Sequence, residues 1–248
     1  MSLRVDRAGG AALAALRAGP ATVFASFERS CYVETPSGIA CLGGPGLGLG
    51  PLNAIVEDFA SVPVGSSVFV ELDQAGLWQP CETFSNGHVP EIQIPISIEK
   101  PARAFLAWLR NEGTSPDGLI GLGSGLTPAG DDFVGGAMIA LRVAGRNAGD
   151  AALADRIAAW ALPLAETNTG KISRAHLRCA AAGEGHEALH QLLNALHSRA
   201  KSRQALKKLS LIGHTSGLDA AAGALHALKL WRPDGDSNPG YRRERAMS

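Results

Sequence analysis

The chain has few of the residues that mark several common protein classes. Its four cysteines, Cys31, Cys41, Cys81 and Cys179, show no C-x-x-C spacing and no clustering with histidines. This pattern argues against a zinc site or a disulfide framework. No apolar run reaches the roughly 18 residues of a membrane-spanning helix, and the N-terminus lacks the basic and apolar regions of a secretory signal. These absences favour a reducing cytoplasm and no membrane partner.

Aromatic residues are also scarce, with two tyrosines and seven phenylalanines among 248 residues. None of them is interleaved with basic side chains, and the net charge is zero, so nucleic acid is not an expected partner. The charge is unevenly placed, because residues 1–100 carry 5 basic and 10 acidic side chains and residues 101–248 carry 18 and 13. An excess of basic residues favours a small anionic ligand. A solvated basic helix face is the more common explanation.

What the chain does contain is enough apolar material for a core, 46% of its residues, and 30 glycines. From Pro101 onward the apolar residues recur with a helical period. We therefore predict an α+β protein with a β-rich N-terminal half and an all-helical C-terminal half. The expected parts are a β-rich domain at 1–100, a helical domain with the glycine-rich motifs at 101–232, and a disordered tail at 233–248. Strands are expected at 22–28, 31–35, 39–42, 67–71 and 92–98.

A glycine-rich segment at residues 43–53, GGPGLGLGPLN, interrupts the expected strands. Two interpretations are open. The segment is either a flexible surface loop or a stretch of backbone that lets a ligand or a partner come close.

The strongest functional signal lies at residues 121–136, GLGSGLTPAGDDFVGG, where a glycine-rich loop enters a helix. Thr127 is a good N-cap, and Pro128 suits the first helical position. Free backbone N–H groups and the positive end of the helix dipole make such a terminus a ready anion site. The candidate substrate-binding residues of this loop are therefore Gly123, Ser124, Gly125 and Thr127.

Asp131 and Asp132 fall in the first turn of that helix. They can simply complement the helix dipole, which is worth about 0.3–1 kcal/mol each. The helix is apolar on every side, however, and is therefore expected to be buried. Buried carboxylates need hydrogen bonds, charged partners or a metal. Gly135 and Gly136 indicate the close approach of another backbone, because each costs about 1 kcal/mol relative to alanine in a helix. We predict that Asp131 and Asp132 are catalytic residues and candidate ligands of Mg²⁺.

A second motif at residues 213–223, GHTSGLDAAAG, repeats this design. Ser216 and Asp219 have the S-x-x-D spacing of a capping-box variant, and helix capping alone would explain them. It does not explain why His214 and Thr215 crowd the same turn. His214 is therefore a candidate catalytic residue, and Thr215, Ser216 and Asp219 are candidate substrate-binding residues.

A third cluster lies at residues 167–173, TNTGKIS, and lacks the spacing of a phosphate-binding P-loop. Thr169 and Ser173 are either ordinary capping residues or further substrate-binding residues. His186 and His190 have i, i+4 spacing without an H-E-x-x-H pattern, so we expect exposed or partly buried helix residues there and no metal site.

Together the three motifs resemble the AllH-like family, which includes the AllH subunit of oxamate carbamoyltransferase. The resemblance covers roughly residues 20–230 and is most specific at 121–132. The usual family motif reads G-L-G-P-G-L-T-P-S-G-D-D. Here Ser124 stands in the proline position and Ala129 in the serine position, while the glycines, the Thr-Pro pair and both aspartates are kept.

The resemblance implies a cytoplasmic protein that acts with an FdrA-like and an AllG-like subunit. Such a complex interconverts oxalurate plus phosphate with oxamate plus carbamoyl phosphate during allantoin breakdown. The resemblance assigns no residue roles, so the roles depend on the chemistry of the motifs. The glycine loop would hold a phosphate or carboxylate, Asp131 and Asp132 would hold Mg²⁺ or orient a donor, and His214, or Thr215 with Ser216, would complete the pocket.

A bare anion beside two aspartates would be repelled, so a bridging cation or a nearby basic side chain is also expected. The alternative function is a non-catalytic scaffold subunit, whose glycine motifs serve helix packing and subunit assembly.

Overall fold

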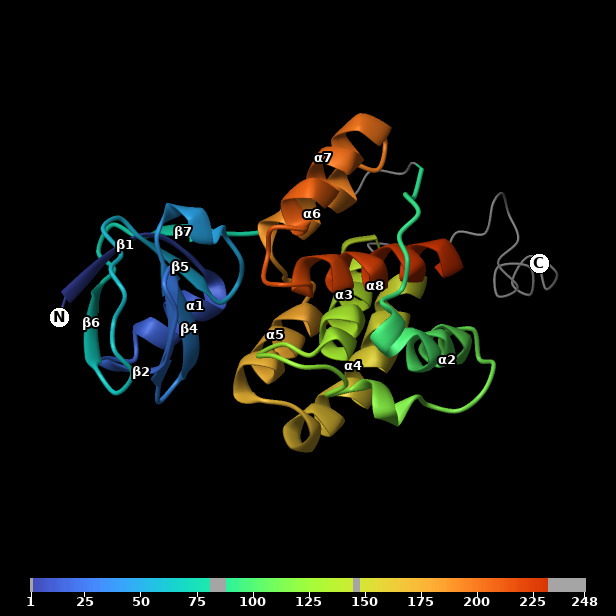
Figure 1. The fold of residues 1–248 in the computed structure, drawn as a ribbon, viewed down its shortest axis with the longest axis horizontal. Coiled ribbons are helices and arrows are strands. Elements are labelled where there is room, and N and C mark those ends of the chain that lie inside the picture. The colour runs from blue at the N-terminus through green and yellow to red at the C-terminus, as the bar shows by residue number, and fades with distance from the viewer. Residues whose placement is uncertain (1, 81–87, 145–147, 232–248) are drawn as a thin grey trace. The chain divides into compact units, whose positions relative to one another are not determined.

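The computed structural model describes residues 2–80, 88–144 and 148–231 and confirms the predicted α+β class (Figure 1). Contacts divide the chain into two units. One comprises Met1–Glu82 and Glu184–Gln191, and the other comprises Thr83–Gly183 and Leu192–Ser248. The first unit is rich in strands, as expected for residues 1–100, but its border lies near residue 82 and it includes a short segment from the helical half. The tail expected at 233–248 lies outside the described residues.

The N-terminal unit is built on a mixed sheet of seven strands that closes on itself. The strand order is β5-β4-β3-β2-β6-β1-β7, and β5 also pairs with β1, which closes a ring of six strands and leaves β7 beside β1. Helix α1, Gly10–Leu16, follows β1 directly. The core of the N-terminal unit is formed by buried side chains that include Leu3, Val23, Val33 and Leu42. The strands are β1 Ser2–Gly9, β2 Ala21–Ser26, β3 Ser30–Thr35, β4 Gly38–Gly43, β5 Asn53–Val56, β6 Ser67–Glu71 and β7 Gly76–Trp78.

The prediction of a strand at residues 92–98 is wrong. These residues form irregular backbone and a short 3-10 turn, Ile96–Ile98, that leads into helix α2, Glu99–Leu109. Pro95 has no N–H to donate to a sheet. The N–H of Ile98 turns back to the Pro95 carbonyl at 3.0 Å. The alternating isoleucines therefore belong to a helix entry.

The glycine-rich segment at 43–53 packs against the returning segment of the same unit. Leu49 donates its N–H to Glu187 Oε1 at 3.0 Å, and the N–H of Glu187 donates to the Leu49 carbonyl at 2.8 Å. Gly48 has φ +74°, and a Cβ there would lie 2.6 Å from His186 Nε2. Of the two interpretations left open for this segment, the close approach of a partner therefore agrees with the structure, and that partner is the chain's own residues 184–191.

The helical unit is organised around α3, Ala129–Ala144, which packs against α4, α5 and α8 (Figure 1). Eleven residues of α3 are buried, from Gly130 and Asp131 to Leu141, so the expectation of a helix buried on every side is confirmed. The remaining helices are α4 Ala148–Asn168, α5 Lys171–Ala181, α6 Glu187–Asn194, α7 Arg199–Leu209 and α8 Ser216–Trp231.

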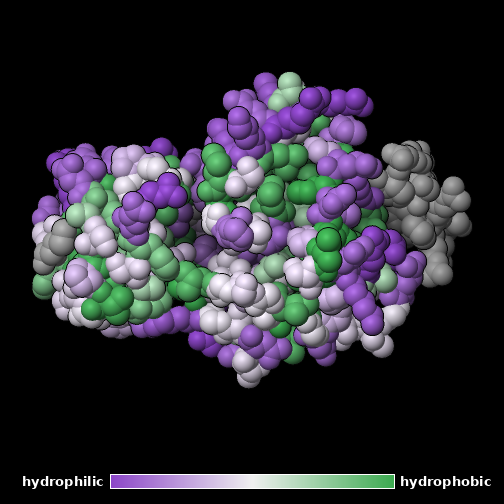
Figure 2. Space-filling model, in the orientation of Figure 1, coloured by the Kyte–Doolittle hydropathy of each residue, from purple (hydrophilic) through white to green (hydrophobic). Residues whose placement is uncertain are grey.

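The basic excess of the C-terminal half is concentrated partly on α7. Its residues Lys201, Arg203, Lys207 and Lys208 are exposed, and the surface over this helix is hydrophilic (Figure 2). This agrees with a solvated basic face.

The structure describes most of the cysteines and the apolar character of the helices. Cys31 and Cys41 are buried free thiols, whereas Cys81 lies outside the described residues. Within the described part of the chain, no helix combines the length and the apolar character needed to cross a membrane.

Candidate functional site

The first glycine motif forms a tight loop against the backbone of its own unit. Gly121, Gly123 and Gly125 have φ values of +84°, +125° and +98°, so positive φ recurs at every second residue. A Cβ on Gly121 would lie 2.1 Å from the Asn168 carbonyl oxygen, and one on Gly123 would lie 2.7 Å from the Ala129 nitrogen. Positive φ at these positions favours glycine. Residues 123–126 are exposed, so the loop presents its backbone to solvent at the start of α3.

The capping position of α3 lies one residue later than expected. The carbonyl of Pro128, not of Thr127, accepts the first helical bonds, from the N–H groups of Asp131 at 2.9 Å and Asp132 at 3.0 Å. Because proline is compatible with the first turn, the loop still enters the helix smoothly. The hydroxyl of Thr127 is thereby released from capping and lies 2.8 Å from the hydroxyl of Ser216.

Asp131 ties together three segments of the helical unit. Its side chain is 2% exposed. Oδ1 accepts the N–H of Gly121 at 2.7 Å, and Oδ2 accepts the hydroxyl of Ser173, on α5, at 2.6 Å. Both oxygens therefore have partners within the protein. This arrangement makes Asp131 a residue that positions the glycine loop.

Asp132 points to a different neighbourhood, at the start of α8. Burial raises the pKa of Asp132 to about 8, hydrogen bonds from Ser216 and Thr127 oppose this shift, and the charges of Asp219 and Asp131 add to it. Its Oδ2 is buried and has no hydrogen-bond partner among the described residues. A buried carboxyl group with a strongly raised pKa is a candidate functional group.

Asp219 is the second acid of this neighbourhood. Its side chain is 2% exposed, and its Oδ2 also has no partner among the described residues. Burial raises the pKa of Asp219, and a hydrogen bond from Thr215 opposes the shift. Two unpartnered carboxylate oxygens thus occur where the first turns of α3 and α8 meet.

The second motif places only some of its residues in this site. Helix α8 begins at Ser216, and the Thr215 carbonyl accepts the N–H groups of Leu218 and Asp219, each at 2.9 Å. Thr215 therefore takes the capping position expected for Ser216. His214 and Thr215 are exposed, whereas Ser216 is half-buried and faces Thr127.

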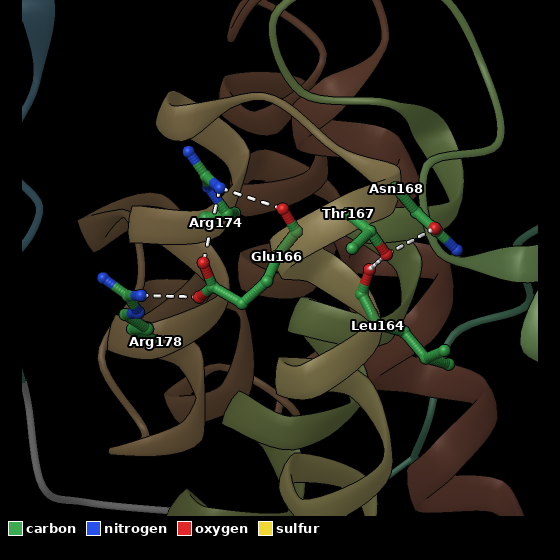
Figure 3. Close-up of polar contacts among 6 residues, drawn as sticks. All are labelled: Leu164, Glu166, Thr167, Asn168, Arg174 and Arg178. Carbon is green, nitrogen blue, oxygen red and sulfur yellow. Dashed lines mark hydrogen bonds and ion pairs between the residues drawn. The ribbon is translucent and has the colours of Figure 1, made fainter.

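The third cluster contributes one buried contact, from Ser173 to Asp131. The Thr169 hydroxyl is buried without a partner in the described part of the chain. The junction of α4 and α5 is held by Glu166, which pairs with Arg174 at 3.3 Å and Arg178 at 2.6 Å (Figure 3).

Two glycines set the distance between α3 and α8. A Cβ on Gly136 would lie 1.9 Å from the Ala220 carbonyl oxygen, and one on Gly223 would lie 1.8 Å from that of Phe133. The close backbone approach expected at Gly136 is therefore confirmed. Gly135 differs, because a Cβ there would meet only the side chains of Ala180 and Leu177, at 3.6 and 3.8 Å. The backbone contact at Gly136 and Gly223 brings the N-terminal turns of the two helices together.

A comparison with protein families identifies the part of the chain that contains these helices. Residues 119–228 match the model of oxamate carbamoyltransferase subunit AllH. The predicted resemblance is confirmed over this region, which begins later than the residue 20 expected from the motifs. No curated protein and no solved structure matched the chain.

All the predicted site residues lie within the AllH region, and contacts link seven of them. The linked residues are Thr127, Asp131, Asp132, Ser173, Thr215, Ser216 and Asp219. The predicted residues on the exposed loops are Gly123, Ser124, Gly125, His214 and Thr215. Among the described residues, no group of three or more His, Cys, Asp or Glu side chains is placed to hold a metal ion.

Two histidines of the AllH region lie in the N-terminal unit. His190 is 2% exposed, more buried than expected, and its Nε2 accepts the N–H of Gly185 at 3.1 Å. Burial lowers the pKa of His190 to about 4, and the neighbouring His186 adds to this shift. Its ring also meets Trp78 edge-on. These contacts fit a packing role for His190.

The parts played by Gly121 and Gly223 were not predicted from the sequence. The N–H of Gly121 holds Asp131, and Gly223 completes the helix contact with Gly136. Both glycines lie in motifs that were noted, but their partners are distant in sequence. A helical glycine in each of two apolar helices is the available signal of such a contact.

Proposed function

We propose that this chain is the AllH-type subunit of a complex that converts oxalurate and phosphate to oxamate and carbamoyl phosphate. The observation that supports this most directly is the family match over residues 119–228. The partners would be an FdrA-like and an AllG-like subunit. The substrate would bind where the N-termini of α3 and α8 meet.

The exposed glycine loop suits the anionic part of such a substrate. Alternating signs of φ turn successive backbone N–H groups toward one side, which creates a concave anion-binding surface. The alternation at Gly121, Gly123 and Gly125 has this form. The positive end of the α3 dipole adds to the attraction.

The buried acids require a separate role, because they would repel an anion placed beside them. Asp131 already uses both oxygens within the protein, whereas Asp132 and Asp219 each retain a free oxygen. A role in contacting substrate, or Mg²⁺ bound with it, therefore suits Asp132 better than Asp131. Thr127 and Ser216 would orient Asp132 through their hydroxyl groups.

The test is reconstitution of the complex from three subunits. The chain is co-expressed with the two partners, and formation of carbamoyl phosphate from oxalurate is measured with and without phosphate. We expect activity that requires this chain and falls at least tenfold with Asp132→Ala. Asp6→Asn, a change of an exposed acid in the N-terminal unit, is the control and should leave the activity unchanged.

A scaffold is the second candidate function, and the contact through Gly136 and Gly223 favours it, because these glycines are explained by packing alone. The same assay separates the two functions. A complex that needs the chain but is unaffected by Asp132→Ala would support the scaffold. A complex that is fully active without the chain would contradict both.

A further inference from the structure

Exposed leucines gather where the starts of α3 and α8 meet. Leu126 is 45% exposed and directly precedes Thr127, and Leu218 is 37% exposed and follows Ser216 by two residues. The hydroxyls of Thr127 and Ser216 lie 2.8 Å apart, so the two leucines belong to one region of the surface.

A third leucine joins them from the turn that connects α7 to α8 (Figure 1). Leu211 is 76% exposed. Its turn packs on the start of α8, because the Gly217 N–H donates to the Ile212 carbonyl at 3.3 Å and a Cβ on Gly217 would lie 2.1 Å from the Leu209 carbonyl oxygen. Exposed apolar residues that occur singly are ordinary, whereas a group of them marks an interaction site. We define this group as the leucine rim, Leu126, Leu211 and Leu218.

Helix α7 adds a basic stripe next to the leucine rim. Arg199, Arg203 and Lys207 follow one another at four-residue spacing, which places them on one face of a helix. All three side chains are exposed. The stripe leads to the rim, because Leu211 lies one turn beyond Lys207 and donates its N–H to the Lys208 carbonyl at 3.1 Å.

The basic stripe does not stabilise the helix that carries it. Like charges at four-residue spacing repel one another, and Arg199 lies in the first turn of α7, at the positive end of the helix dipole. Among the described residues, no acid forms an ion pair with Arg199, Arg203 or Lys207. The sequence has no aspartate or glutamate between Glu187 and Asp219. Acidic groups on another molecule would therefore relieve a repulsion that the described part of the chain leaves uncompensated.

We infer that the leucine rim and the basic stripe form the docking surface for a second subunit of the complex, whose contact face presents apolar side chains beside acidic ones. The inference depends on the proposed function for the existence of this subunit. The surface lies within residues 119–228, which match the model of a subunit. Its charge has one sign, so a complementary face is acidic. Because Leu126 belongs to the glycine loop, the docked subunit would also cover the start of α3.

Other occupants fit this surface less well. Residues 188–218 contain no phenylalanine, tyrosine or tryptophan, so the bases of a nucleic acid would have no aromatic ring to stack on. Ala205 and Leu209 of α7 are buried in the protein, so this helix has no apolar face to place in a lipid surface. A second copy of the chain is distinguished by experiment, because residues 1–100 carry 10 acidic and 5 basic side chains.

The test measures the affinity of the full-length chain for the two co-purified partner subunits by titration calorimetry. Leu211→Ser should weaken binding at least tenfold, because the leucine would be buried only in the complex. The double variant Arg203→Glu with Lys207→Glu should also weaken binding at least tenfold. Added salt should weaken binding of the wild type more than binding of the double variant. All three residues are exposed, so circular dichroism should show an unchanged fold.

Two matched changes in the N-terminal unit are the controls. Phe69→Ser removes another apolar side chain, which is 56% exposed, and Arg29→Glu reverses the charge of another exposed basic residue. Both variants should bind the partner subunits as tightly as the wild type does. Hydrogen exchange gives an independent measurement, and the amides of residues 199–218 should exchange more slowly in the complex than in the free chain.

Several outcomes would overturn the inference. These are no binding of the partner subunits by the wild type, wild-type affinity in Leu211→Ser and in the double variant, or an equal weakening by the two controls. A different occupant would also overturn it. The sign of one would be self-association of the chain in sedimentation, or binding to single-stranded DNA or phosphatidylserine vesicles, that the double variant loses while it keeps its affinity for the partner subunits.

Formation of carbamoyl phosphate separates this inference from the proposed function. An active complex that tolerates Leu211→Ser and the double variant with unchanged affinity would contradict the docking surface and leave the proposed function intact. A complex that assembles through this surface as expected, but forms no carbamoyl phosphate from oxalurate, would contradict the proposed function and leave the docking surface intact.

Discussion

The hydroxyl of Thr127, ahead of α3, lies 2.8 Å from the hydroxyl of Ser216, the first residue of α8. This bond joins two glycine-rich motifs that are distant in the sequence. It also places both hydroxyls beside Asp132, where they lower a pKa that burial raises. The two motifs therefore meet in one cluster of side chains.

Replacing Asp131 and Asp132 separately should give opposite effects on stability. Asp131→Asn puts an NH₂ group against either the Gly121 N–H or the Ser173 hydroxyl, so we expect the free energy of unfolding to fall by about 1–3 kcal/mol. Asp132→Asn removes a buried charge without a basic partner, so stability at pH 8 should stay equal or rise. Urea unfolding of both variants measures the difference. Equal losses would contradict the distinct roles.

The pH dependence of stability should reveal the raised pKa of Asp132 directly. Its pKa is about 8 in the folded protein against 3.8 for the free side chain. Between these values the folded state holds a proton that the unfolded state has released, so stability decreases as the pH rises. We expect the wild type to lose more stability than Asp132→Asn between pH 5 and pH 8. Thermal unfolding at the two pH values measures this, and parallel profiles would show that Asp132 is not buried as described.

His190 should make the stability of the protein fall as the pH decreases, which is the opposite of the trend expected from Asp132. Burial lowers its pKa to about 4, below the 6.5 of the free side chain. As the pH falls from 6.5 to 4, the unfolded state takes up a proton first and the folded state is destabilised. His190→Gln should make the thermal midpoint less sensitive to pH over this range. His197→Gln, at an exposed position, is the control and should leave the wild-type sensitivity unchanged.

Replacing the neighbouring glycines Gly135 and Gly136 of α3 by alanine should change the stability in opposite directions. Gly136→Ala would place a methyl group 1.9 Å from the Ala220 carbonyl oxygen, which forces the helices apart, so we expect a loss of several kcal/mol. Gly135→Ala would meet side chains at ordinary contact distances and should stabilise the chain by up to about 1 kcal/mol. Denaturant midpoints of the two variants test this pair. A similar loss in both would contradict the described helix contact.

The sequence was informative where the signals are local. Glycine loops followed by hydroxyl residues and acids placed the caps of α3 and α8 to within one residue, because turn and capping preferences act within a few residues. The sequence could not distinguish Asp131 from Asp132, because their roles depend on what each one faces. Successive helical residues point about 100° apart, so one carboxylate meets Gly121 and Ser173 and the other meets Ser216.

The strands also could be predicted only in part from the sequence. Four expected strands were found as β2, β3, β4 and β6, but β1 and β7 were not expected. Strand β5, Asn53–Val56, was not expected either, because it is buried at all four positions and has no alternation to detect. Conversely, the isoleucines of 92–98 alternate well but are interrupted by Pro95. Periodicity and turn signals therefore predicted β4, although it is largely buried, and missed β1, although its burial alternates over Leu3 and Val5.

The contact of Gly136 and Gly223 has a consequence for how the protein is made. Helix α3 ends at Ala144 and α8 begins only at Ser216, so α3 is synthesised well before α8 can pack against it. Until then the apolar surface around Phe133 has no α8 backbone to cover it. The nascent chain would expose this surface during translation and depend on the cell's chaperones to keep it from aggregating.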